Sequence, residues 1–131
     1  MKYAPAIAGG LLGLLFVLSG LVVLLKLVPM PPPPEGSPAA LFMGAFGPTG
    51  YLAFVKVLEV LGGILIAIPR TRNLGLLVLG PIIVNILAFH VFINKGTGLL
   101  DPALIIIVAL AAFLLWSGRK SFAGLLDAKV R

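Results

Sequence analysis

Four polar residues interrupt the apolar segments of this 131-residue chain, and they are the side chains best suited to chemistry. Lys56 and Glu59 lie within one apolar run, and Asn85 and His90 lie within the next. An ammonium, a carboxylate, an amide and an imidazole can together hydrogen-bond an oxygen-bearing ligand and move a proton. Ionisable groups cost a few kcal/mol each at membrane depth and mark functional sites by default. We therefore predict that these four residues form a ligand pocket.

The depths of the four residues support a shared pocket. At a rise of 1.5 Å per residue, Glu59 and Asn85 both lie about 12 Å below the outer ends of their runs. Lys56 lies about 8 Å and His90 about 5 Å below the same surface. Two antiparallel helices would therefore bring the pairs together in the outer half of the membrane. On an ideal helix Asn85 and His90 are about 140° apart, so either a bend at Pro81 rotates the upper part of the helix or His90 faces another helix.

Each of these residues also has a structural interpretation. Lys56 and Glu59, three residues apart, can neutralise each other as an ion pair that specifies packing. The Lys56 amine can also extend to the membrane surface. Asn85 can join two helices by a hydrogen bond, and His90 can either anchor a helix end or handle a proton.

The composition places these residues in a membrane protein. Hydrophobic residues make up 60% of the chain, charged residues 11%, and the mean hydropathy is +1.19. A soluble domain of this size cannot bury so much apolar surface, and a bilayer span needs roughly 20 apolar residues. The runs are continuous rather than alternating, which favours helices over barrel strands. We predict one all-α domain, 1–131, an integral membrane four-helix bundle whose spanning helices cover residues 5–28, 51–68, 74–93 and 101–116.

Short elements complete the prediction. Ser37 followed by Pro38 is typical of a helix start, so a short helix is expected over 38–46, after a stiff polyproline loop. This helix is too short to span and should lie at the outer surface or re-enter the membrane as a lid. Asp101 is expected to cap the last spanning helix. Residues 117–131 are expected to form an amphipathic tail on the cytoplasmic leaflet.

The basic residues predict the orientation. One side of the predicted membrane carries seven of them, Lys2, Arg70, Arg72, Arg119, Lys120, Lys129 and Arg131, and the other side carries Lys26 and Lys95. Under the positive-inside rule both termini are cytoplasmic. The net charge of +6 has the same origin, so it indicates contact with anionic lipid rather than with nucleic acid.

Other features limit the chemistry. The chain has no cysteine and a single histidine, so neither thiol exchange nor a self-contained metal site is expected, and no nucleotide-binding or hydrolase motif is present. The chain is therefore not expected to be an enzyme by itself. Gly9, Gly13 and Gly20 share one face of the first helix and allow close helix packing. This seam could be internal, which we favour, or could join two copies in a homo-oligomer.

The order and spacing of several short motifs resemble the DoxX family of small four-helix bacterial membrane proteins. The motifs extend over most of the chain and are Ser19-Gly20, Pro29-Met30, Phe42-Met43-Gly44, Thr49-Gly50-Tyr51, Lys56, Glu59, Gly62-Gly63, Pro81-Ile82, Asn85 and Phe89-His90. The resemblance implies a location in the bacterial cytoplasmic (inner) membrane. It adds Tyr51 and Lys26 as candidate pocket residues, although Lys26 lies further from Ser19-Gly20 than the corresponding lysine in many members.

Two functions follow from the pocket and the resemblance. Members of the family are named for a membrane subunit of a thiosulfate:quinone oxidoreductase, and others are placed in membrane-associated redox complexes. By this resemblance the pocket would bind a small amphiphile such as a quinone, with Lys56 and His90 on a carbonyl oxygen and Glu59 handling a proton, while a redox partner protein supplies the electrons. Distant relatives resemble receptor-assembly chaperones, and the alternative is an assembly or stability factor for another membrane protein with a purely structural polar core.

Overall fold

The computed structural model describes residues 2–126, and every regular element in that range is helical. The predicted all-α class is therefore confirmed for this part of the chain. The elements are α1 (Ala4–Leu24), α2 (Pro38–Phe46), α3 (Tyr51–Ala67), η1 (Pro69–Thr71), α4 (Arg72–Ala88), the π-helical turn η2 (Phe89–Ile93), α5 (Pro102–Ser117), α6 (Arg119–Ala123) and η3 (Gly124–Leu126).

Two to four helices are long and apolar enough to cross a membrane. The two continuous ones are α1, with 21 residues, and the stretch Pro69–Ile93, with 25. The other two candidates are bent pairs, in which α2 meets α3 at 80° and α5 meets the segment Arg119–Leu126 at 70°. With 17 and 16 residues, α3 and α5 are about 25 Å long, slightly less than the ~30 Å hydrocarbon core.

The first helix is shorter than its apolar run predicts. It ends at Leu24 rather than at residue 28, and Lys26 has a φ of 52°. A left-handed residue cannot continue a right-handed helix, so the chain turns although apolar residues follow. The other three predicted segments, 51–68, 74–93 and 101–116, each match helical structure to within two residues at either end.

Local capping determines where α2 and α5 begin, as predicted. The Ser37 hydroxyl accepts a hydrogen bond from the backbone amide of Ala40 at 3.1 Å, and the Asp101 carboxylate accepts one from that of Ala103 at 2.9 Å. Part of the predicted tail is also described. Phe122 packs against the hydrophobic core, whereas Leu125 and Leu126 are exposed, and residues 127–131 lie outside the described part of the chain.

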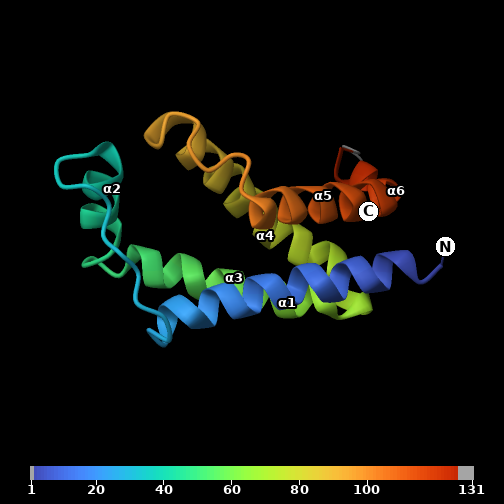
Figure 1. Cartoon of the computed structure of the whole chain (residues 1–131). Helices are drawn as coiled ribbons and strands as arrows, with labels where there is room; N and C mark the ends of the chain where they lie inside the picture. Colours follow the sequence, from blue (N-terminus) through green and yellow to red (C-terminus); the bar gives the residue numbers. More distant parts are fainter. Residues whose placement is uncertain (1, 127–131) are drawn as a thin grey trace.

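The closest helix pair is α1 and α3, which run side by side in Figure 1. A Cβ at Gly13 would collide with the backbone carbonyl oxygen of Gly63, and one at Gly20 would lie 2.5 Å from a methyl of Val60. The glycine face of α1 is therefore used within the chain, and the internal seam that we favoured is confirmed.

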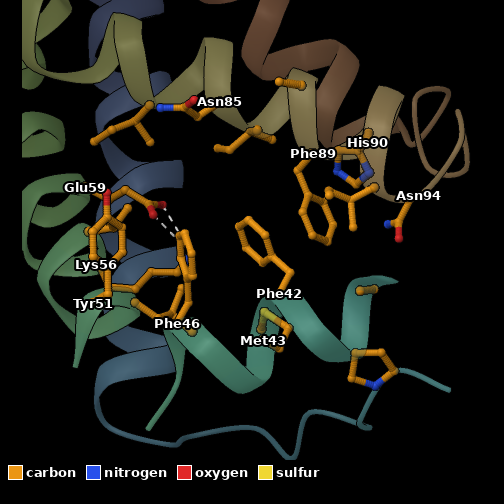
Figure 2. Close-up of a pocket in the computed structure, with 18 of the residues that line it drawn as sticks. Phe42, Met43, Phe46, Tyr51, Lys56, Glu59, Asn85, Phe89, His90 and Asn94 are labelled. Carbon is orange, nitrogen blue, oxygen red and sulfur yellow. Dashed lines mark hydrogen bonds and ion pairs between the residues drawn. The ribbon is translucent and has the colours of Figure 1, made fainter. Parts of the chain in front are cut away.

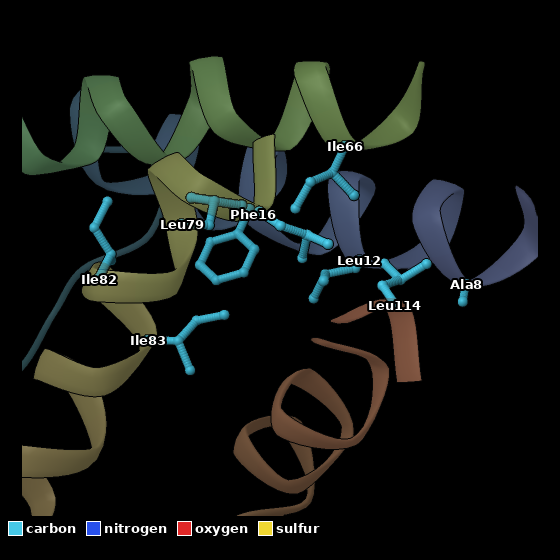
Figure 3. Close-up of a cluster of buried hydrophobic side chains, with 9 residues drawn as sticks. Ala8, Leu12, Phe16, Ile66, Leu79, Ile82, Ile83 and Leu114 are labelled. Carbon is cyan, nitrogen blue, oxygen red and sulfur yellow. The ribbon is translucent and has the colours of Figure 1, made fainter. Parts of the chain in front are cut away.

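The buried hydrophobic core joins four helices. Its fully buried side chains come from α1, α3, α4 and α5, and they are Leu12, Phe16, Ile66, Leu79 and Leu114 (Figure 3). Ile66 belongs to the carboxyl-terminal part of α3 and Leu79 to the middle of α4. The amino-terminal part of α3 and the carboxyl-terminal part of α4 therefore remain free to line a cavity.

Candidate functional site

A cavity of about 920 Å³ lies between α2, the amino-terminal half of α3 and the end of α4 with its π turn. Prolines of the loop before α2, Pro31, Pro33 and Pro34, also line it. Figure 2 shows the Lys56–Glu59 pair on one side, His90 on the opposite side and Phe42 projecting from α2 between them. The structure thus brings all four predicted pocket residues to one cavity, since Lys56, Glu59, Asn85 and His90 each line it.

The ion pair is local and largely buried. The Lys56 Nζ lies 3.2 Å from Glu59 Oε2 and 3.4 Å from Oε1, and the two side chains are 17% and 4% exposed. The matched depths predict that Glu59 contacts Asn85 or Lys56 and faces the protein interior, and of the two it contacts Lys56 from a buried position. The ammonium and the carboxylate carry opposite charges, so the pair has no net charge. Lys56 has three N–H donors, so at least one remains for a ligand oxygen beyond the two contacts with Glu59.

His90 reaches the cavity through an unusual backbone turn. The backbone amide of Asn94 donates to the carbonyl oxygen of Phe89 at 3.0 Å, an i to i+5 bond that defines the π turn. Asn85, in the α-helical part, and His90, in the π turn, both line the same cavity although they are about 140° apart on an ideal helix. Of the two alternatives offered for His90, a bend at Pro81 or a contact with another helix, the contact seen differs from both, because Nδ1 lies against the Thr97 carbonyl oxygen in the loop before α5. Single π turns within α-helices are frequent at functional sites.

The imidazole of His90 is held by the loop that follows. Its Nδ1 lies 3.1 Å from the backbone carbonyl oxygen of Thr97. Gly98 makes this approach possible, because a Cβ there would lie 2.9 Å from Nδ1. Asn85, by contrast, is exposed, lies in the last turn of α4 and lines the cavity. Its side chain makes no hydrogen bond among residues 2–126. Its amide therefore remains available to a ligand.

Aromatic side chains form one wall of the cavity, and of these only Tyr51 was predicted from the sequence as a pocket residue. Phe42 stacks on Phe46 with ring centroids 4.1 Å apart and meets Phe89 edge-on at 4.8 Å. Phe46 contacts Tyr51 at 4.5 Å. This chain of rings connects α2 to α3 and to the π turn (Figure 2). The signal in the sequence is the i, i+4 spacing of Phe42 and Phe46 on a helix too short to span.

The two further candidates have different positions. Tyr51 lines the cavity at the first residue of α3, whereas Lys26 lies in the turn after α1 and is not among the lining residues. Within residues 2–126, no group of three His, Asp or Glu side chains is arranged to hold a metal ion.

Comparison with known proteins gives one informative relationship. No family model matches the chain, and no solved structure matches it. The uncharacterized protein YwoB of Bacillus subtilis (strain 168) is 35% identical over 75 residues, which are 57% of this chain. The match covers 47% of YwoB, so the aligned region is about half the length of that relative.

Proposed function

We propose that this protein is a four-helix membrane protein whose cavity binds a small ring-bearing amphiphile of the quinone class. The observation that carries the proposal is the cavity itself. Its volume of about 920 Å³ lies in the range of ligand pockets, ~300–1,000 Å³. It combines an aromatic wall with a few polar groups, which is the usual composition of a site that orients a small organic ligand.

The wall favours a flat ligand. The Phe42 ring lies within 5 Å of both the Phe46 ring and the Phe89 ring. Aromatic rings gain ~0.5–1.5 kcal/mol per well-placed partner beyond the area buried. An aliphatic chain alone would use none of this geometry.

The polar groups favour an uncharged head with oxygen atoms. A net-neutral ion pair attracts neither an anion nor a cation strongly, but the Lys56 ammonium can still donate to a ligand oxygen. A neutral ring carrying oxygen substituents therefore fits the site better than a phosphate or an amine does. Glu59, in contact with the same ammonium, is positioned to exchange a proton through it.

The setting of the site is part of the proposal. The helices α1, α3 and α5 and the stretch Pro69–Ile93 each span the membrane in this proposal, which gives four spans, and the basic residues orient both termini to the cytoplasm. The motif order that resembles the DoxX family supports a place in the bacterial inner membrane as a subunit or accessory protein of a redox complex. In that complex a partner supplies the electrons and this chain holds the ring.

Binding of a short-chain benzoquinone and its hydroquinone to the purified protein in lipid nanodiscs tests the proposal. We expect saturable binding with one site per chain. Ala88 lines the cavity, so Ala88→Trp should fill it and abolish binding, whereas Ala109→Trp on the exposed surface of α5 should leave binding unchanged. Equal loss in both variants, or partitioning without saturation in the wild type, would count against the site.

A further inference from the structure

The single histidine of the chain has its hydrogen-bonding direction fixed by the backbone. A carbonyl oxygen only accepts hydrogen bonds, so the contact of 3.1 Å with the Thr97 carbonyl requires His90 Nδ1 to carry a proton. In the neutral imidazole the other nitrogen, Nε2, is then an acceptor. Nε2 has no hydrogen-bond partner among residues 2–126, and the His90 side chain lines the cavity.

The loop around His90 is shaped to keep this arrangement. Gly98 has a φ of +89°, and a Cβ on it would lie 2.9 Å from Nδ1 and 3.0 Å from Cε1 of the ring. The backbone amide of Gly96 also donates to the His90 carbonyl oxygen at 2.6 Å. The ring therefore packs directly against the backbone of Thr97 and Gly98, and its tautomer is set before any ligand arrives.

The two sides of the cavity consequently differ in polarity. Lys56 and His90 lie on opposite sides of the cavity (Figure 2). Lys56 offers donors, and the imidazole of His90, in its neutral form, offers an acceptor. A ring whose oxygens are all carbonyls can accept from Lys56 but leaves His90 Nε2 without a partner. A ring with a hydroxyl group can donate to Nε2. His90 is partly exposed, and a ligand that covers Nε2 without donating to it leaves the acceptor unpaired. Covering an acceptor in this way is unfavourable, so the hydroxyl ligand gains relative to the carbonyl one.

We infer that His90, held by the Thr97 carbonyl, selects ligands with a ring hydroxyl, so that the site prefers a hydroquinone to the corresponding quinone. This inference rests on the proposed function and deepens it. It also reverses the role expected from the sequence, in which His90 donates to a carbonyl oxygen.

Two measurements test the inference. The first is the ¹⁵N spectrum of protein labelled only at histidine, which contains one imidazole because the chain has one histidine. Recorded at pH 8 without ligand, it should show a protonated Nδ1 and an unprotonated Nε2. A spectrum dominated by the opposite tautomer, with the proton on Nε2, overturns the inference.

The second measurement compares three states of one short-chain ring: the hydroquinone, the quinone and the hydroquinone dimethyl ether, under anaerobic conditions. We expect the hydroquinone to bind about tenfold more tightly than either of the others and to shift the Nε2 resonance. If all three bind equally, the inference fails while the proposed function stands. If none binds, the proposed function fails and the hydroxyl preference fails with it, whatever the tautomer.

A matched pair of glycine variants tests the cause. Gly98→Ala places a methyl against the ring, whereas Gly96→Ala imposes the same strain, since its φ is +90°, with no neighbouring atom within 4 Å. Gly98→Ala should move the proton from Nδ1 to Nε2 and remove the tenfold preference, and Gly96→Ala should change neither. Identical behaviour of the two variants would show that the ring contact does not set the selectivity.

Discussion

Glu59→Gln is the change that separates a ligand site from a structural ion pair. Glutamine keeps the shape and the hydrogen-bonding capacity of the side chain but removes its charge. The Lys56 ammonium would then lose its partner, which now lies 3.2 Å away. The expected effect follows from the burial of both groups.

The loss in the free energy of unfolding depends on how far the Lys56 ammonium can move out of the buried site once Glu59 is neutral. Breaking a buried pair by removing one partner costs ~3–5 kcal/mol, because the other charge stays buried alone. The Lys56 side chain is 17% exposed and its amine can extend along the cavity, so we expect about 3 kcal/mol, the lower end of that range. For a chain of this size the melting temperature should fall by about 10 °C.

The assay is thermal unfolding in one detergent, with ring binding measured on the same samples. Glu35→Gln is the matched control, because Glu35 is exposed in the loop before α2. The double variant Lys56→Met/Glu59→Gln removes both charges and should recover to within about 1 kcal/mol of the wild type. A Glu59→Gln protein as stable as the Glu35→Gln control would refute the buried-pair argument. A stable variant that has lost ring binding would instead assign Glu59 to the ligand.

Three further predictions concern the fold. Gly13→Ala should destabilise the protein by about 1–3 kcal/mol, because its methyl meets a backbone carbonyl of α3. Gly10→Ala, whose methyl meets no atom within 4 Å, should be neutral or slightly stabilising. Equal effects of the two variants in a thermal melt would contradict the close packing of α1 on α3. Removing the α2 cap with Ser37→Ala should cost about 1 kcal/mol and speed amide exchange across 38–46, and unchanged exchange would show that the cap is dispensable. Single cysteines introduced at positions 35 and 71 of the cysteine-free chain should react with an impermeant reagent from outside at 35 and not at 71; the reverse pattern would mean that the termini are outside.

The features that the sequence predicted correctly are those decided within a few residues. The caps at Ser37 and Asp101 act on amides two or three positions away, and the Lys56–Glu59 pair is one helical turn long. Such interactions need no knowledge of the tertiary structure. The glycine face of α1 was also predicted correctly, because the spacing of residues along a helix determines which of them share a face.

The features that were not predicted depend on contacts between distant segments. The continuous apolar run predicted a first helix that reaches residue 28, but the chain turns at Lys26. An apolar run shows which residues are hydrophobic but does not fix the residue at which the helix ends. In the π turn at Phe89–Ile93 each hydrogen bond spans five residues instead of the four of an α-helix. His90 lies in this turn and contacts Thr97 and Gly98, which belong to the following loop. The ring chain from Phe42 to Phe89 likewise required the position of α2.

Photoaffinity labelling with an azido-substituted short-chain quinone tests most directly the claim that this cavity holds the ring. The labelled protein in nanodiscs is digested and the adducts are located by mass spectrometry, with excess unmodified hydroquinone as competitor. We predict competed adducts on Phe42, Met43 and Tyr51, which line the cavity. Adducts that are spread over the exposed apolar surface of α5, such as Ile105 and Ile106, and that resist competition would contradict the account.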